Sequence, residues 1–363
     1  MNQETKKIPL RRRLCTWMRA HTTKTYLIIG AGLILIASGI AFVVVSQTPI
    51  KSTYIPIKPD PKPEPPKEYY SPLTGIPVKN EAATKQAVTA IMLENSPDAR
   101  PQSGLKQSGV VYEAIAEGGI TRFLALYQQE KPKLIGPVRS LRMYYVDWLA
   151  PYNASVAHVG GSAAALTEIR KSTYRDIDQF FNPGTYWRAT DRYAPHNVYT
   201  NFAKIDALNK AKGYTKSTFD GFPRVDGKVS KTPKATSITI NVSSPTYNST
   251  YKYSKKKNHY ARSQGGAPHL DREKGQITPS VVIALKVNMQ RVMQDGYREK
   301  ITTSGKGEAI IFQNGTAKTV TWRKANRKSQ LHFTDKSGEE VSLVRGQTWI
   351  TAVPNGSGSV SWR

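Results

Sequence analysis

The chain has 363 residues, with 53 Lys and Arg against 26 Asp and Glu, which gives a net charge of +27. Cys15 is the single cysteine, so a framework of intrachain disulfides is excluded. In a cytoplasmic protein a charge of this size would favour nucleic acid as the partner. An apolar segment near the N-terminus indicates another compartment, and we therefore expect no nucleic acid.

Residues 26–45 (YLIIGAGLILIASGIAFVVV) are apolar and uncharged, and a helix of about 20 such residues spans the ~30 Å hydrocarbon core of a bilayer. Seven Lys and Arg precede this segment against the single acid Glu4, which favours a cytoplasmic N-terminus. A cleaved secretory signal is the alternative, but the segment is long and Val45-Ser46-Gln47 fits a cleavage site poorly. Cys15 precedes the apolar segment, whereas a lipoprotein cysteine follows it. The sequence predicts a single-pass plasma-membrane protein with a cytoplasmic basic tail at 1–25 and a transmembrane helix at 26–45.

A proline-rich segment at 46–68 follows, and its part at 51–67 has prolines at 56, 59, 61, 63, 65 and 66. Such spacing favours extended polyproline II, so we expect an extracytoplasmic stalk. The remaining residues suffice for two extracytoplasmic domains, an α/β (or α+β) domain at 69–225 and a smaller, mostly-β domain at 226–363. The first has 19 Lys and Arg against 13 Asp and Glu, and the second has 23 against 9, a net of +14. This basic surface favours anionic cell-wall polymer or lipid headgroups as partners, although a solvated basic face is the simpler alternative.

The first domain alternates strands and helices. The expected buried strands are Ala87–Leu93, Leu134–Val138 and Ala154–Val159, and the expected helices are Arg139–Ala150, Ser162–Arg170 and Phe202–Lys212. Val110–Glu117 and Ile120–Gln128 flank Gly118-Gly119, which is typical of a tight hairpin. Because strand side chains alternate, pairing of Glu117 with Ile120 would place Glu113, Glu117 and Arg122 on one face.

Polar residues follow the expected strands at the edge where α/β sheets bind ligands. Arg139 and Arg142 come at one strand-to-helix junction, and His158 and Ser162 come at another. Helix N-termini there favour phosphate or carboxylate, and the arginines add bidentate donors. A later turn-like segment contributes Arg188, Arg192, His196 and Asn197. We expect one cleft that gathers Arg122, Arg139, Arg142, His158, Arg192, His196 and Asn197, against the alternative of separate surface ion pairs.

The sequence argues against metal, cofactor and nucleophile sites. The histidines have no close-spaced metal pattern such as H-x-x-x-H. Gly161-Ser162-Ala163 is only a fragment of a nucleophile elbow. Neither G-x-G-x-x-G nor a Walker loop occurs in a strand–helix context, so no cofactor is expected.

The second domain reads as a small β-sandwich or barrel, because short alternating runs are separated by turns. The expected strands are Ser237–Ser243, Val281–Val287, Glu308–Gln313, Thr319–Arg323, Gln330–Thr334, Glu340–Leu343 and Thr348–Val353. The basic, tyrosine-containing segment Tyr253–Asp271 suits polyanions or sugars, although a charged loop is the default interpretation.

Several motifs resemble those of the YerB-like family. They are Ser71-Pro72-Leu73-Thr74-Gly75, Glu94-Asn95-Ser96 with Ala99-Arg100-Pro101-Gln102, Glu117-Gly118-Gly119-Ile120-Thr121-Arg122, Gly136-Pro137-Val138-Arg139-Ser140-Leu141-Arg142 and Arg192-Tyr193-Ala194-Pro195-His196-Asn197. Gly265-Gly266-Ala267-Pro268-His269-Leu270-Asp271 is similar to the family's C-terminal domain. The resemblance implies a bacterial two-domain envelope protein, often lipid-anchored, with peptidoglycan-synthesis proteins as candidate partners. It also implies that Asn95 and Arg100 belong to the same pattern as the other site residues.

Two hypotheses from different classes remain. The first is a binding module whose cationic cleft holds an anionic envelope ligand and serves an accessory or regulatory role. The second is an enzyme acting on an envelope glycan or phosphodiester, with Glu117 or Glu113 and His158 or His196 as acid and base. Neighbouring arginines would lower carboxylate pKa values, which favours binding over catalysis.

Overall fold

The structure is a computed structural model that describes residues 10–20, 22–47, 67–171, 173–293 and 298–363. The chain divides into two units, Met1–Pro65 and Pro66–Arg363. The first contains the helices α1 (Leu10–Ala20) and α2 (Thr22–Gln47). Most of the predicted stalk, residues 48–66, lies outside the described residues, and the prediction's first two residues belong to α2.

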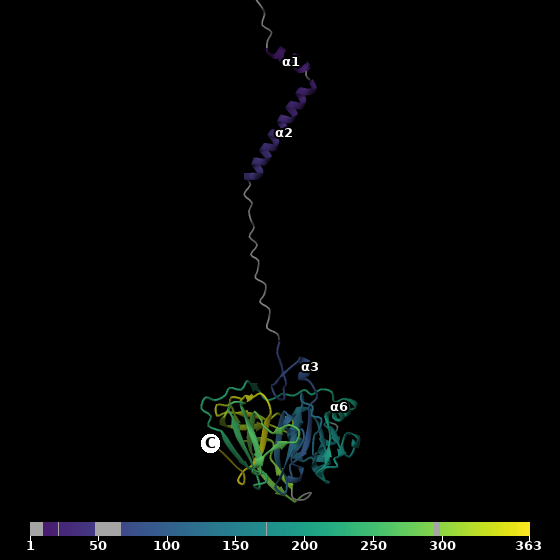
Figure 1. Ribbon diagram of the computed structural model, residues 1–363, viewed down its shortest axis with the longest axis vertical. Helices are drawn as coiled ribbons and strands as arrows, with labels where there is room; N and C mark the ends of the chain where they lie inside the picture. The colour runs from purple at the N-terminus through teal and green to yellow at the C-terminus, as the bar shows by residue number, and fades with distance from the viewer. Residues whose placement is uncertain (1–9, 21, 48–66, 172, 294–297) are drawn as a thin grey trace, which may run out of the picture. The chain divides into compact units, whose positions relative to one another are not determined.

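Helix α2 (Figure 1) contains an 18-residue window, Tyr26–Val43, with a mean hydropathy of 2.4. Its large apolar side chains, such as Leu35 and Phe42, are exposed. The helix is long and apolar enough to cross a membrane, as the sequence predicts.

A twelve-stranded mixed sheet runs through the second unit. Its main path is β22-β21-β20-β17-β24-β4-β5-β3-β6-β7, and β18 and β19 join it at β4. The strands from the first half are β3 (Thr89–Glu94), β4 (Val110–Glu117), β5 (Ile120–Tyr127), β6 (Ser155–His158) and β7 (Arg175–Asp178). Those from the second half are β17 (Val281–Val287), β18 (Met289–Val292), β19 (Arg298–Ile301), β20 (Gly305–Gln313), β21 (Thr316–Lys324), β22 (His332–Thr334) and β24 (Thr348–Pro354).

The two halves meet where β24 pairs with β4 in parallel, from Thr348 opposite Val110 to Thr351 opposite Glu113. In Figure 1 the green and yellow strands accordingly continue the blue ones. The structure is therefore mixed α/β with a mostly-β C-terminal part, as expected, and strands on both sides of the predicted boundary at 225 and 226 share this sheet.

A five-stranded antiparallel sheet, in the order β14-β13-β12-β11-β25, comes entirely from the second half. Its strands are β11 (Ser237–Asn241), β12 (Ser249–Ser254), β13 (His259–Gln264), β14 (Ala267–Pro268) and β25 (Ser359–Trp362). Ile238 and Tyr251 of this sheet share a buried cluster with Val282 and Trp349 of the large sheet. The small sheet therefore packs against one face of the large one.

Helices cover the rest of the two faces. Tyr145 and Trp148 of α4 (Met143–Leu149) and Ile169 of α5 (Ala163–Ile169) pack on the face that carries Met92 and Leu124. Phe202 of α6 (Phe202–Ala211) packs on the opposite face. The remaining short elements are α3 (Glu81–Thr84) and the strand pairs β1 (Tyr69–Tyr70) with β2 (Pro77–Val78), β8 (Trp187–Arg188) with β9 (Val198–Tyr199), β10 (Arg224–Val225) with β23 (Leu343–Val344), and β15 (Leu270–Asp271) with β16 (Gly275–Gln276).

Three expected elements differ from the structure. Of the strand expected at Glu340–Leu343, only Leu343 lies in a strand, as the first residue of β23. Leu134–Val138 is not a strand, because Ile135, Gly136 and Val138 form isolated bridges to three different segments and no continuous ladder arises. The helix expected at Arg139 begins only at Met143. Arg139 N donates to Met92 O and Leu141 N donates to Gly160 O, so β3 and the end of β6 hold these residues in an extended conformation.

Candidate functional site

The carboxyl ends of four strands meet at one edge of the large sheet. β3 is parallel to β6, and β6 is parallel to β7. β4 is antiparallel to β5, which is antiparallel to β3, so β4 runs in the same direction as these three. The strands end at Glu117, Glu94, His158 and Asp178. We call this the polar edge, and it is where ligands bind in open α/β sheets.

The hairpin that carries Glu113, Glu117 and Arg122 does not place them on one face. Glu117 pairs with Ile120 as expected, but a β-bulge shifts the register, so that Ala114 and not Ile115 lies opposite Arg122. A shift of one residue reverses the side-chain parity of the strand. Glu113 therefore lies on the face opposite that of Glu117 and Arg122.

Glu117 holds two arginines on one carboxylate. Arg122 Nη2 and Arg142 Nη2 each donate to Glu117 Oε1 at 2.8 Å, and Arg142 Nε donates to Oε2 at 3.1 Å. Partial burial raises the pKa of Glu117, but the charges and hydrogen bonds of the two arginines outweigh this and hold the pKa at about 2. Burial and the charge of Arg122 lower the pKa of Arg142 to about 10. The group therefore carries two positive charges for one negative charge.

Glu94, the last residue of β3, lies directly opposite Arg122 on β5. Its Oε1 accepts a hydrogen bond from Ser96 Oγ at 3.0 Å, lies 2.9 Å from His196 Nδ1 and is 3.3 Å from Arg139 Nε. The side chain is buried, yet Glu94 Oε2 and Arg139 Nε make no hydrogen bond among the described residues. Buried polar atoms of this kind are uncommon in native proteins.

Arg139 joins the two groups. Burial lowers the pKa of Arg139, with Glu94 opposing this shift and the charges of Arg122 and Arg188 adding to it. These arginines therefore lie within electrostatic reach of one another. We call the set Glu94, Glu117, Arg122, Arg139 and Arg142 the arginine cluster. Arg139 does not lie on a helix as the sequence predicted. It lies in an extended segment whose backbone bonds to Met92 of β3 on one side and to Val159, just after β6, on the other.

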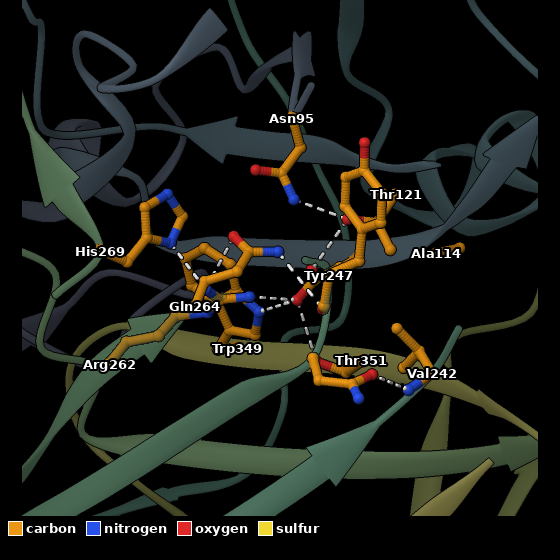
Figure 2. A network of polar contacts seen from close by, with 12 residues as sticks. Asn95, Ala114, Thr121, Val242, Tyr247, Arg262, Gln264, His269, Trp349 and Thr351 are labelled. Atoms are coloured by element: carbon orange, nitrogen blue, oxygen red, sulfur yellow. Dashed lines mark hydrogen bonds and ion pairs between the residues drawn. The ribbon is translucent and has the colours of Figure 1, made fainter. Parts of the chain in front are cut away.

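Glu113 lies in a buried network on the other face of the sheet. Figure 2 labels its partners Arg262, Trp349 and Thr351. Glu113 Oε2 accepts from Arg262 Nη2 at 2.8 Å, Trp349 Nε1 at 2.9 Å and Thr351 Oγ1 at 3.3 Å. Arg262 is fully buried because β13 alternates, with Tyr260, Arg262 and Gln264 facing inward. The default interpretation of Tyr253–Asp271 as a charged loop is therefore wrong, since much of it forms the hairpin of β12 and β13.

A second path of hydrogen bonds leads from Arg262 to Glu113 through four other side chains and closes the network into a ring. Arg262 Nη1 approaches His269 Nδ1 at 2.7 Å, and because arginine cannot accept, Nδ1 is the acceptor and Nε2 donates to Gln102 Oε1 at 2.9 Å. Burial and the charges of Arg262 and Arg100 hold the pKa of His269 well below its ordinary value, so the imidazole of His269 is neutral. Gln102, Asn95 and Thr121 complete the path to Glu113. We call this the buried polar ring.

Asn95 is thus a member of this ring, and Arg100 donates to Asn95 from outside the ring. Arg100 Nε donates to Asn95 Oδ1 at 3.1 Å, and its guanidinium lies over the Tyr247 ring. Both side chains are committed to holding the start of the segment that follows β3.

His158 and Ser162 lie at the polar edge with separate partners. His158 is fully buried, with Nε2 2.9 Å from Asp176 Oδ1 and Nδ1 2.8 Å from Gly160 O. Ser162 Oγ caps α5 by accepting from Ala165 N at 3.4 Å. A backbone hydrogen bond links the residues after His158 to the arginine cluster, because Val159 N donates to Arg139 O.

The segment around 188–197 folds as a closed loop against the turn after β3. Asn197 Oδ1 accepts from Arg188 Nη1 at 2.8 Å, and Asn197 Nδ2 donates to Ala189 O and Arg192 O. Arg192 donates to Asp98 O at 2.7 Å and Pro101 O at 2.8 Å. This loop and the turn after β3 border an open groove of about 610 Å³. The groove is lined by Asp98, Pro101, Asp191, Arg192, Tyr193, His196 and Arg272. We call it the Tyr193 groove.

Of the residues expected in one cleft, Arg122, Arg139, Arg142 and His196 come together through Glu94 and Glu117. Glu94 was not predicted as a site residue, although it directly follows the expected strand Ala87–Leu93 and begins the motif Glu94-Asn95-Ser96. Arg262, His269 and Trp349 were not predicted either, and strand alternation in Tyr253–Asp271 would have been a signal for Arg262. Within the parts of the chain that the structure describes, three or more His, Cys, Asp or Glu nowhere group as a metal site would require.

Comparisons with known proteins agree with this architecture. The family described as "Protein of unknown function (DUF3048) N-terminal domain" matches residues 73–215, and its C-terminal domain matches residues 238–350. "Putative lipoprotein YerB" of Bacillus subtilis (strain 168) is 32% identical over 302 residues, which are 82% of this chain and 89% of that protein. The crystal structure of Bacillus subtilis YerB matches with a TM-score of 0.71 and 29% identity over 81% of this chain and 99% of that one.

The relative's name and the apolar helix α2 are both consistent with a membrane anchor. The two domain matches cover more than half of the chain, and the resemblance stated from its motifs is confirmed. The chain belongs to the YerB-like family, the two-domain DUF3048 proteins of unknown function.

Proposed function

We propose that this protein is anchored in the plasma membrane with its C-terminal domains outside, and that the arginine cluster binds an anionic group of an envelope ligand. The observation that carries the proposal is the charge balance of the cluster, in which three guanidinium groups share the carboxylates of Glu94 and Glu117. Arg122 and Arg142 are buried, while Arg139 and His196 keep about a quarter of their side chains exposed. Arg139 and His196 would contact the ligand, and the buried pair would supply positive potential behind them.

A phosphoryl group suits such a site, because fork-shaped guanidinium donors match its oxygens. The same chemistry occurs in phosphate-containing wall polymers and in lipid headgroups, and binding to either would fit an accessory or regulatory role in the envelope.

The enzyme hypothesis has four candidate acids and bases, and His196 is the one that best fits such a role. Glu117 is held ionised by two arginines, while Glu113 and His158 are buried and engaged. His196 Nδ1 faces Glu94, and its residue lines the Tyr193 groove, as a proton carrier would require. Binding remains the better supported function, because Glu113 and His158 are buried, and Glu117, although 33% exposed, is held ionised by two arginines and is therefore a weak base.

The test uses the full chain in detergent micelles and calorimetric titration with inorganic pyrophosphate. Arg139→Ala should weaken binding by roughly 1.5–3 kcal/mol, the range for a charge-assisted hydrogen bond. Arg323→Ala, which removes an exposed arginine on β21, is the matched control and should bind as the wild type does. Equal affinities for all three proteins would refute the proposal. Soluble poly(glycerol phosphate) and phosphatidylglycerol in mixed micelles then distinguish a polymer from a lipid.

A further inference from the structure

We propose that the Tyr193 groove is a saccharide subsite, so that the ligand of the neighbouring arginine cluster is an anionic glycan. The inference rests on the proposed function only for the anionic group. The groove and the cluster share His196, which lines the groove and contacts Glu94 through Nδ1 at 2.9 Å. A sugar lying in the groove would thus have its substituents next to Arg139, which is 3.3 Å from the same Glu94 oxygen.

Tyr193 supplies the flat apolar surface that sugar rings stack on. Its side chain is 92% exposed, although both flanking segments are held in place. Large aromatic rings that remain this exposed contribute little to the core, and a tyrosine offers an apolar face together with a polar hydroxyl. On a closed loop, such a ring is positioned for a ligand at little cost in conformational entropy.

The groove's charged groups suit hydroxyl recognition better than anion capture. Arg192 is engaged by two backbone carbonyls, and Arg272 Nη2 donates to Asp191 Oδ2 at 2.6 Å. The side chain of Asp98 is 79% exposed, and its Oδ2 lies 3.9 Å from His196 Nε2. Carboxylates accept hydrogen bonds from sugar hydroxyls. The carboxylates of the groove would repel a phosphate or an anionic membrane surface. The negative group of the ligand therefore belongs in the arginine cluster, and its neutral sugar ring belongs in the groove.

The walls of the groove are fixed before any ligand arrives. Arg192 ties its loop to the turn at Asp98 and Pro101, and Arg272 ties the same loop to the C-terminal domain. A preformed groove with a few convergent polar groups is the usual form of a small-ligand site. Glu94, at the inner end of this arrangement, has a buried oxygen without a hydrogen-bond partner among the described residues, so the protein's own groups leave the site incomplete.

The experiment titrates the full chain with a neutral probe, the tetramer of N-acetylglucosamine, in a detergent without a sugar headgroup. Tyr193→Ala should weaken tetramer binding by about tenfold or more, because an aromatic stacking surface is lost. Tyr193→Phe keeps that surface and should bind within about twofold of the wild type. Phe181→Ala removes another exposed aromatic ring outside the groove and should leave binding unchanged.

Pyrophosphate provides the second readout. Tyr193→Ala should bind it as the wild type does, since the anion is assigned to the arginine cluster. Absence of tetramer binding to the wild type, or equal binding by Tyr193→Ala, would overturn the saccharide subsite even if pyrophosphate binding still depended on Arg139. Failure of the wild type to bind pyrophosphate would instead overturn the proposed function, whatever the tetramer does.

Discussion

Arg262 Nη2 lies 2.8 Å from Glu113 Oε2, and these side chains, 149 residues apart in the chain, are 0% and 1% exposed. Arg262 belongs to the C-terminal domain and Glu113 to the N-terminal one. The guanidinium also lies 4.5 Å from the Trp349 ring centroid, while Trp349 Nε1 donates to the same carboxylate. The two domains therefore share a buried polar ring, in addition to a sheet, and we expect them to unfold together.

Removal of one member of this pair should be strongly destabilising. Arg262→Met should lower the free energy of unfolding by about 3–5 kcal/mol, because it leaves the Glu113 carboxylate buried without its charge partner. The double variant Glu113→Gln/Arg262→Met removes both charges and should be more stable than the sum of the single effects predicts. Denaturant unfolding of the full chain in micelles, followed by tryptophan fluorescence, measures this cycle.

Strictly additive effects would show that the pair does not interact energetically. A double variant that unfolds in two separate transitions would contradict the cooperative behaviour of the domains. An exposed ion pair, Lys318 with Asp335, is the control, and Lys318→Met should cost at most about 1 kcal/mol.

Glu117→Gln should change stability and anion binding in opposite directions. Glu117 is the internal counterion of Arg122 and Arg142, so its neutralisation leaves two buried guanidinium groups without a carboxylate and lowers stability. The same change removes one negative charge from the arginine cluster, and with it the carboxylate that competes with the ligand for the arginine donors. Pyrophosphate affinity should therefore rise, as calorimetric titration can measure. A variant that loses both stability and affinity would mean that Glu117 orients the arginines rather than competing with the ligand.

Acid should release the stabilisation that Glu117 provides. Its pKa in the folded protein, about 2, is depressed from an ordinary value of 4.5, despite partial burial, by Arg122 and Arg142. A depressed carboxylate pKa gives stabilisation that is complete above pH 4.5 and is lost as the pH falls towards 2. Thermal unfolding between these pH values should show a steeper loss in the wild type than in Glu117→Gln. Parallel curves would contradict the assignment of this titration to Glu117.

The strands and helices with clear periodicity could be predicted from the sequence, and each error has an identifiable cause. β17 and the hairpin of β4 and β5 agree closely with the expected ranges, because alternating apolar residues and Gly118-Gly119 define them. The start of α4 could not be placed, since backbone bonds to Met92 and Gly160 decide it, and these partners are distant in sequence. The hairpin of β12 and β13 was obscured by its many lysines, which occupy exposed positions and the turn at Asn258.

The site was predictable only as a location. Strand order places polar residues at one edge. The bulge after Ile115, however, puts Glu113 and Glu117 on opposite faces, and no pattern in the sequence predicts this bulge. Asn95 and Arg100 were grouped with the cleft because they share a motif with Glu94, whereas strand parity directs Asn95 to the opposite face. Motif membership shows that residues belong together in the fold without showing which face of the sheet they occupy.

The orientation in the membrane can be tested with the single cysteine. Cys15 precedes α2 and is exposed in the structure. If the basic tail is cytoplasmic, a membrane-impermeant maleimide should modify Cys15 only after permeabilisation of wall-stripped cells, because moving the preceding arginines across the bilayer is unfavourable. The variant Cys15→Ser/Ser357→Cys, which places the thiol on an exposed turn of the C-terminal domain, should react in intact cells. Modification of Cys15 from outside would reverse the orientation. Release of the Ser357→Cys chain into the medium without its N-terminus would establish the cleaved signal instead of the anchor.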